Sequence, residues 1–437
     1  MSSMPAVDWD ALTEEAVGLL SDYLRIDTTN PPGHETRATE WFGELLAAEG
    51  VPFRTYARDP ERATLVATLP GDGSRGRALV LLNHTDVVPA EAAHWREEPL
   101  SGAVHDGHVW GRGAIDMKGM GVMQLMTLLL HRRLGLPLRR DLTLIAVADE
   151  ETGGGEGIEF LAREHPETLA CDFVINEGGM GAHETFGVRR PVFNVGVAEK
   201  GPLWLRLVTT GVPGHGSVPH GDNALERLVR ALDRVQRWER PFEQTPEVAQ
   251  YFERLFESGV LPEAPSPASL RALAGQHPRV LSLLTNSVSL TTVTAGVKHN
   301  VIPAQAEATL DVRLVPGYDP ARFIEQLRAV LDDPAVRIET VFEASTPVSP
   351  LGTELYRAIE RAVHDVMEDA AVVPSVSTGF TDSRAFRRLG IPAYGFIPVL
   401  LEPDASAGMH GNDERLAIDQ LRLGMQILFA TVREVCG

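Results

Sequence analysis

Three apolar runs in this chain end in residues that can bind a metal ion or move a proton. The runs at 78–83, 142–148 and 172–176 consist mostly of apolar residues, which is typical of parallel strands buried on both faces. They are followed by His84 and Asp86, by Asp149, Glu150 and Glu151, and by Glu177, respectively. Because ligands bind at the carboxyl ends of strands in an open α/β sheet, these residues are expected to share one rim. The pattern predicts an α/β fold with a mostly parallel sheet and helices on both faces.

A glycine-rich loop between the first two runs carries Asp116. Gly111 and Gly113 precede this aspartate, and a helix is expected from Met117 to about His131. Asp116 could bridge two ions through its two carboxylate oxygens or cap the helix, and the two roles are compatible. A phosphate-binding loop is a third option, but neither of its usual glycine signatures occurs here. With the rim residues, this set of imidazole and carboxylate groups favours a divalent metal site with more than one ion.

The acidic run after the second strand is the sharpest local signal. Three carboxylates beside a buried strand repel one another, so a positive partner should offset them, although a solvated charge run is the ordinary alternative. One residue of the pair Glu150 and Glu151 is expected to bind an ion, and the other to act as general base. For His84 and Asp86, the aspartate is expected to fix the tautomer of a ligating histidine. The alternative is that both residues only cap the following loop.

Two of the 14 histidines lie in glycine-flanked loops and are candidate site residues. His215 stands in the segment GVPGHGS, and His410 stands in GMHGN, just before the expected final helix. Most other histidines are expected to be structural or on the surface. A ligand as far downstream as His410 indicates that the C-terminal part of the chain returns to the first domain.

The pattern of strands and helices changes after about residue 196. Strands and helices alternate up to 176, whereas the following stretch has α+β character. A chain of 437 residues is expected to form two domains. Residues 1–196 and 317–437 are predicted to form the catalytic, metal-binding domain, and residues 197–316 an inserted domain. The stretch at 243–285 is expected to be helical and contains several prolines, and no catalytic or binding role is predicted for it.

Charge and cysteine content narrow the function class. The net charge of −20 argues against nucleic acid and against an anionic membrane surface as partners, since both attract basic proteins. With only two cysteines, a cysteine metal cluster is excluded and a disulfide framework is not expected. The sequence shows no secretory signal and no apolar run long enough to span a membrane, so a cytoplasmic protein is expected.

With these residues assembled, the sequence resembles the M20 metallopeptidase family. The matching stretches, in the family's order, are NHTDVVP (83–89), WGRGAIDMKG (110–119), DEETGG (149–154), INEGG (175–179), GVPGHGSVPHGDNA (211–224), TAGVKHNVIPAQAEATLDVR (294–313), STGFTDSR (377–384) and GMHGNDE (408–414). They span nearly the whole chain. Within the family, the INEGG form and the 294–313 stretch are closest to the aminoacylase and carboxypeptidase-S-like branch.

The resemblance implies a role for each candidate residue. His84, Asp116 and Glu177 would hold one ion, Glu151 and His410 would complete a second, and Asp116 would bridge the two. Asp86 would orient His84, Glu150 would be the general base, and the peptide bond after Asp116 would be cis. His215, on the inserted lid domain, would stabilise the oxyanion, often in a neighbouring subunit's site. Asn300 and Arg313 would contact the substrate carboxylate or oxyanion, and Gly379 and Thr381 would line the substrate's other end.

The expected activity is therefore hydrolysis of the amide bond of an N-acyl amino acid or small peptide by a metal-bound hydroxide. Two Zn²⁺ ions per chain are expected, with Co²⁺ or Mn²⁺ as substitutes, and a homodimer through the lid domain. Two alternatives stay open. One is a narrow biosynthetic deacylase for acetylornithine or succinyl-diaminopimelate. The other is a catalytically dead interaction protein of the same fold.

Overall fold

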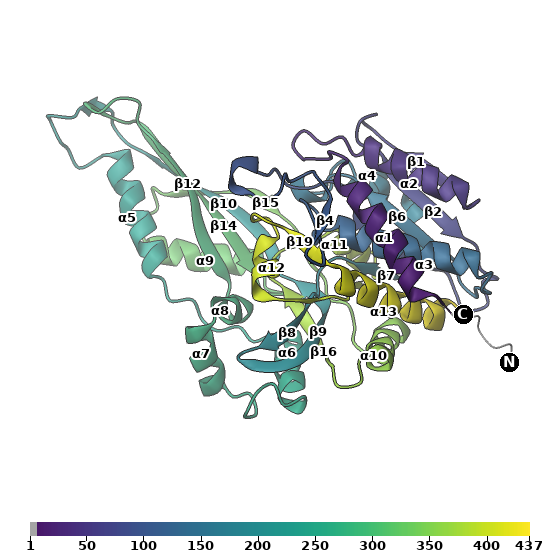
Figure 1. The fold of residues 1–437 in the computed structure, drawn as a ribbon. Coiled ribbons are helices and arrows are strands. Elements are labelled where there is room, and N and C mark those ends of the chain that lie inside the picture. The colour runs from purple at the N-terminus through teal and green to yellow at the C-terminus, as the bar shows by residue number, and fades with distance from the viewer. Residues whose placement is uncertain (1–6) are drawn as a thin grey trace.

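A computed structural model describes residues 7–437 and places a large mixed sheet at the centre of the molecule (Figure 1). The sheet has the order β1-β2-β6-β3-β7-β17-β9-β8-β18, and β16 pairs with β9. Its strands are β1 (Phe53–Tyr56), β2 (Thr64–Leu69), β3 (Ala78–His84), β6 (Leu142–Val147), β7 (Cys171–Asn176), β8 (Gly181–Thr185), β9 (Val188–Glu199), β16 (Ala371–Ser377), β17 (Ala393–Gly395) and β18 (Leu400–Leu401). The central strands β6, β3, β7 and β17 run parallel to one another. The predicted α/β class is confirmed.

Helices cover both faces of this sheet, as the continuous apolar runs require. On β3, Leu79 and Leu81 pack into one cluster, whereas Val80 and Leu82 pack into another on the opposite face. The first face is covered by α1 (Trp9–Leu24), α2 (Thr36–Ala48), α3 (Lys118–Arg133), α10 (Glu354–Val366) and α13 (Ile418–Cys436). The second is covered by α4 (Ile158–Glu164) and α11 (Ser383–Arg388). Because the side chains of these strands are buried on both faces, only residues at the strand ends can contact a ligand.

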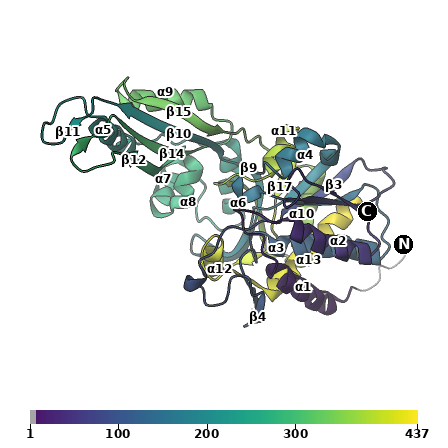
Figure 2. The same ribbon diagram turned by 90° about the horizontal axis from the view of Figure 1, so that it is seen from above.

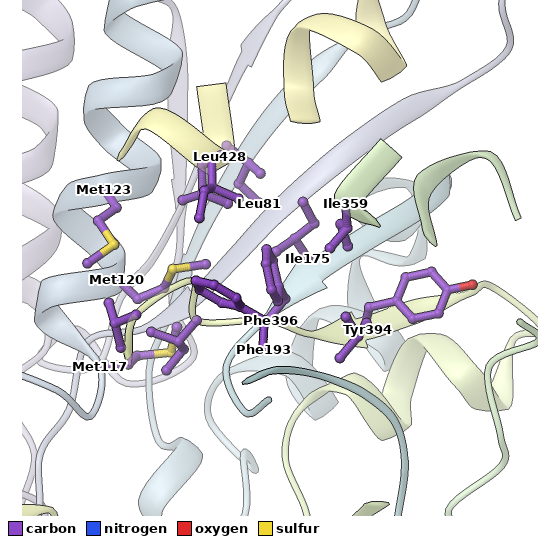
Figure 3. Packing of buried hydrophobic residues seen from close by; sticks show 14 of the residues in the cluster. Leu81, Met117, Met120, Met123, Ile175, Phe193, Ile359, Tyr394, Phe396 and Leu428 are labelled. Atoms are coloured by element: carbon purple, nitrogen blue, oxygen red, sulfur yellow. The ribbon is translucent and has the colours of Figure 1, made fainter. Parts of the chain in front are cut away.

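Helix α3 is the most buried helix of the first face. Every residue from Lys118 to His131 is buried, including the polar Gln124. A helix that is buried all round belongs in the core. Figure 3 shows Met120 and Met123 of this helix among the buried side chains of the cluster, together with Phe396 and Leu428. The loop that precedes α3 is therefore anchored to the rigid core.

A second sheet extends to one side of the large one (Figures 1 and 2). Its order is β12-β14-β10-β15, formed by β10 (Gly201–Thr210), β12 (Ser287–Ala295), β14 (Gln305–Leu314) and β15 (Arg337–Glu343). One face packs against α5 (Ala224–Arg237) and α9 (Pro320–Leu331), with Leu203 and Leu205 of β10 in the shared core. At its far end lies a short ribbon of β11 (Gly214–His215) and β13 (Val301–Ile302) (Figure 2).

The remaining elements connect these parts. They are β4 (Ala103–His105), β5 (His108–Trp110) and β19 (Arg415–Ala417), which form a three-stranded sheet, the helices α6 (Pro246–Glu257), α7 (Pro267–Gln276), α8 (Pro278–Leu284) and α12 (Pro403–Gly408), and the 3₁₀ turns η1 (Ala92–His94), η2 (Glu150–Thr152) and η3 (Pro166–Leu169). Between residues 7 and 437, no helix is both long and apolar enough to cross a membrane.

The packing bears on the division into domains, which stays a proposal. Helix α9 and strand β15 follow the expected boundary after residue 316, yet both pack with the second sheet. Helices α6–α8 lie inside the expected insertion, yet residues such as Phe252 belong to the large core. We therefore propose that the inserted unit runs to about residue 343 and that α6–α8 are part of the catalytic body.

Candidate metal centre

Two groups of ligand atoms meet at the rim of the large sheet and share one residue. His84, Asp116 and Glu177 form the first group, and Asp116, Glu151 and His410 form the second, each with its ligand atoms within 4.8 Å of one another. His84 Nε2 lies 3.1 Å from Asp116 Oδ1, and His410 Nε2 lies 3.1 Å from Asp116 Oδ2. Each oxygen of Asp116 thus faces a different histidine, which is the arrangement that a bridging carboxylate needs.

The five residues come from five separate segments. His84 ends β3, Glu177 follows β7, and Glu151 lies in the turn after β6. Asp116 stands in the loop before α3, and its peptide bond to Met117 is cis, as the family resemblance implied. His410 lies in the loop after α12. The carboxyl ends of the central strands therefore meet the C-terminal part of the chain at one place.

Asp86 forms hydrogen bonds both to His84 and to the turn that carries Glu150 and Glu151. His84 Nδ1 donates to the Asp86 carbonyl oxygen at 3.0 Å, so Nε2 faces the ligand group. The buried Asp86 carboxylate accepts hydrogen bonds from the backbone N–H groups of Glu150 at 3.1 Å and Glu151 at 3.2 Å. Asn30 Nδ2 donates to the same carboxylate at 2.8 Å. The aspartate thus fixes the tautomer of His84 and also the turn that carries the two glutamates.

The cluster shifts the pKa of its members strongly. Burial alone would lower the pKa of His84, but the carboxylates of Glu177 and Asp116 raise it well above its usual value. Hydrogen bonds to Asp116 and Glu151 raise the pKa of His410 to about 10. Burial raises the pKa of Glu177 to about 7, although the charge of His84 opposes the rise. A bound divalent cation would compete with protons for these three groups.

The donor set fits a divalent metal ion. All ligand atoms are carboxylate oxygens and imidazole nitrogens, which suit Zn²⁺ and other first-row ions. Glu151 Oε1 is buried and has no hydrogen-bond partner among residues 7–437. A buried carboxylate oxygen without a donor costs free energy unless a cation satisfies it.

Glu150 lies beside the ligands in η2. Burial raises the pKa of its carboxyl group well above the usual value, and the neighbouring Glu177 carboxylate adds to the rise. A carboxyl group with a raised pKa can accept a proton from water and return it to a leaving group. This chemistry matches the general-base role expected from the sequence, which stays a prediction.

Several residues that support the site were not predicted. Glu414 is buried and accepts hydrogen bonds from the backbone N–H groups of Gly113, Ile115 and Asp116 at 2.8–3.0 Å. Arg112 pairs with the same carboxylate at 2.7 Å. The sequence contains Glu414 within GMHGNDE, but no local pattern indicates that it reaches back about 300 positions to the Asp116 loop.

Two further supporting residues lie around the Glu150 turn. Asn30 Nδ2 also lies 3.2 Å from Asp149 Oδ1, so one amide group holds two carboxylates. Asp382 is buried, and neither of its carboxylate oxygens has a hydrogen-bond partner among residues 7–437. Burial raises the pKa of Asp382 to about 8. Asp382 stands within the family-like stretch STGFTDSR, but no role was predicted for it from the sequence, and Asn30 stands in none of the matching stretches.

The candidate residues of the second sheet lie apart from the metal ligands. His215 is exposed on β11, which lies at the end of the inserted unit farthest from the large sheet (Figure 2). Asn300 is beside it, because its carbonyl oxygen accepts a hydrogen bond from Gly216 N at 2.8 Å. The structure therefore does not bring His215 to the metal ligands of its own chain.

The other three candidates lie nearer the large sheet. Arg313 is on β14, and its guanidinium carbon is 5.2 Å from the centroid of the Phe380 ring. Gly379 is exposed in the same loop as Phe380. The Thr381 hydroxyl is buried and donates to Glu199 Oε1 at 2.7 Å, which gives it a structural partner.

Comparison with known proteins agrees with this geometry. The sequence profile of peptidase family M20/M25/M40 matches residues 80–434. The chain belongs to this family. An N-fatty-acyl-amino acid synthase/hydrolase, PM20D1, from Xenopus tropicalis is 32% identical over 369 residues, which cover 81% of this chain and 72% of the relative. Aminoacylase-1 from Homo sapiens is 28% identical over 414 residues, covering 92% and 90%.

Solved structures show the same fold. An M20 family metallo-carboxypeptidase, Sso-CP2, from Sulfolobus solfataricus has a TM-score of 0.74 at 20% identity and covers 96% of this chain and 99% of its own. Human carnosine dipeptidase 1 has a TM-score of 0.71 at 16% identity, covering 98% and 97%. The M20 membership inferred from the motifs is confirmed, and with it a hydrolase of amide bonds of the aminoacylase and peptidase kind.

Proposed function

We propose that this M20 member is a two-metal hydrolase, with zinc as its physiological ion, that cleaves the amide bond of N-acyl amino acids or small peptides. The observation that carries the proposal is the shared carboxylate of Asp116, whose two oxygens each face a different ligand group. A narrower specificity for acetylornithine or succinyl-diaminopimelate has no separate support. A dead site is not favoured either, because the ligands and Glu150 are all present. A cytoplasmic location stays a prediction of the sequence.

In this proposal His84 and Glu177 would hold one ion, Glu151 and His410 would hold the other, and Asp116 would contribute to both. Such ions would polarise the substrate carbonyl and lower the pKa of the attacking water. Asp86 keeps Nε2 of His84 free to bind, since Nδ1 is committed to the Asp86 carbonyl oxygen. One chain would thus supply all five ligands, from strand ends and from two loops beside them.

Glu150 moves the proton. As the water oxygen attacks the amide carbon, the Glu150 carboxylate accepts the water proton. When the tetrahedral intermediate collapses and the carbon–nitrogen bond breaks, the same carboxyl group returns that proton to the leaving amine. The raised pKa of Glu150, caused first by burial and then by Glu177, suits a group that must hold the proton between the two steps.

His215 is proposed to act in the site of a second copy of this chain. It is exposed at the end of the inserted unit, away from its own metal ligands (Figure 2). Exposed valines surround this end, among them Val218 at 66% and Val297 at 98% exposure. Strand β12 is an edge strand of the second sheet, and its outer edge pairs with no strand in the described part of the chain. An apolar end next to an open strand edge supports a two-fold interface between second sheets.

The decisive experiment measures amide hydrolysis by protein stripped of metal with a chelator, before and after Zn²⁺ is added back. The substrate panel contains N-acetyl, N-succinyl and long-chain N-acyl amino acids and a set of dipeptides. Turnover that is lost on stripping and restored by zinc supports the proposal, and the preferred acyl group selects the substrate class. Turnover that survives complete removal of metal would contradict it.

A further inference from the structure

An aromatic cluster joins the second sheet to the rim of the first. Trp204 on β10 and Phe342 on β15 are cross-strand neighbours with ring centroids 5.0 Å apart, and Phe342 lies 6.1 Å from Phe380. Trp204 lies on the face of the second sheet opposite Leu203 and Leu205, which are buried against α5 and α9. Trp204 is 37% exposed, so residues 7–437 leave part of this cluster open at the surface.

The cluster lies next to the guanidinium group of Arg313, which has hydrogen-bond donors that Asp311 does not use. The guanidinium carbon of Arg313 is 5.2 Å from the Phe380 ring centroid. Asp311 accepts hydrogen bonds from Arg313 Nε at 2.7 Å and Nη2 at 3.1 Å, and Nη1 makes no hydrogen bond within residues 7–437, so it can serve another acceptor. Asp311 is the cross-strand neighbour of Trp204, so the arginine, the aspartate and the indole share one face of the sheet.

The same cluster is continuous with the candidate metal centre. Phe380 lies two residues before the buried Asp382. The Asp382 carboxylate lies against Gly154, since a Cβ built on this glycine would be only 2.9 Å from Asp382 Oδ1. Arg384, whose guanidinium carbon is 4.7 Å from the Phe380 ring centroid, donates to the Gly153 carbonyl oxygen at 2.7 Å. The Phe380 loop therefore contacts the end of the turn that carries Glu150.

We infer that Trp204, Phe342 and Phe380 form the subsite for an apolar, preferably aromatic, side chain of the amino acid released by the reaction. The inference rests on the proposed function and takes Arg313, whose Nη1 is not used by Asp311, as the group that binds the substrate carboxylate. In an amino acid the carboxylate carbon and Cβ are attached to the same Cα and lie about 2.5 Å apart. A carboxylate on Arg313 Nη1 thus brings the side chain to the rings, which favour aromatic and large aliphatic groups.

The test compares two substrates that differ only in the amino acid. N-acetyl-L-phenylalanine and N-acetylglycine are assayed with the zinc-loaded full-length protein and with its Trp204→Ala, Trp204→Phe and Phe256→Ala variants. Phe256 is a matched control, since it is 39% exposed but lies on α6. We expect the wild type to favour the phenylalanine substrate at least tenfold in kcat/KM. Trp204→Ala should lower this ratio about tenfold, whereas Trp204→Phe should retain most of it and Phe256→Ala all of it.

A binding measurement separates this inference from the proposed function. Calorimetric titration of the metal-free protein with the same two compounds should show about tenfold tighter binding of N-acetyl-L-phenylalanine, and Trp204→Ala should remove the difference. If no amide is hydrolysed but this preference persists, the proposed function fails and the subsite stands. If hydrolysis proceeds and neither experiment shows a preference, or if Trp204→Ala weakens both compounds equally, the subsite is overturned.

Discussion

At the residue scale, the proposed role of Glu150 can be tested most directly. Replacing Glu150 with glutamine keeps the shape of the side chain but removes its ability to accept a proton. We expect kcat to fall about 10³-fold while the metal content per chain stays unchanged, because Glu150 is not among the ligand atoms. Steady-state kinetics and elemental analysis of the same preparation check both parts. Turnover within tenfold of the wild type would remove Glu150 from the proton-transfer role.

Glu414 acts at a distance from the reaction, through the backbone of the Asp116 loop. Glutamine at this position offers one acceptor oxygen in place of two and faces backbone N–H donors with its own amide. We expect Glu414→Gln to destabilise the protein by about 3 kcal/mol, because it breaks a buried pair with Arg112. We also expect it to weaken metal binding about tenfold. Urea unfolding and competition with a chelator measure the two effects. The exposed Glu98→Gln change serves as control, and metal affinity equal to the wild type would confine Glu414 to stability.

At the scale of the element, helix α3 carries a buried histidine that makes folding sensitive to acid. His131 Nδ1 donates to the Thr127 carbonyl oxygen at 2.8 Å, and its ring packs 4.8 Å from that of Phe429. Burial lowers the pKa of His131 to about 4, against about 6.5 in an unfolded chain. Between these values the unfolded state binds a proton that the folded state does not. The free energy of unfolding therefore falls as the pH falls from about 6.5 to about 4.

This linkage predicts the behaviour of a variant. Between pH 7 and pH 5, His131 should account for a loss of about 2 kcal/mol in the free energy of unfolding. His131→Phe should abolish that part of the loss, since phenylalanine keeps a ring against Phe429 but does not titrate. Denaturant unfolding at the two pH values gives the difference directly. The exposed His94→Gln change should leave the acid sensitivity as it is. The same loss in wild type and His131→Phe would mean that His131 is charged when folded.

At the scale of the whole molecule, the proposed dimer makes each site depend on two chains. Glu150 would come from one chain and His215 from the other, so a mixed dimer of Glu150→Gln and His215→Ala subunits should contain one intact site. Each variant alone should be nearly inactive. After unfolding and refolding of an equal mixture, half of the dimers are mixed, and activity should recover to about a quarter of the wild-type value. Light scattering establishes the oligomeric state first. A mixture no more active than its two components would place His215 outside the partner's site.

The rim of the large sheet could be predicted because its signals are local. A run such as Leu142–Val147 is apolar except for Thr143, which favours burial on both faces, so only the residues after it can face a ligand. His84 and Glu177 each follow such a run directly, and Glu150 follows one after Asp149. Parallel strands of one sheet place these ends side by side without further information, so the candidate ligands follow from the order of residues and the resemblance to M20 proteins.

Only the tertiary structure decided which distant segments support those ligands and which candidates lie elsewhere. Glu414 reaches the Asp116 loop, and Asn30 reaches Asp86, through hydrogen bonds between positions far apart in the sequence. No periodicity of either segment encodes such a contact, because it depends on how the helices stack on the sheet. The same is true of β15, which joins the second sheet, and of His215, which lies away from its own metal ligands. Local patterns determine which residues end a strand, whereas chain packing determines what meets them there.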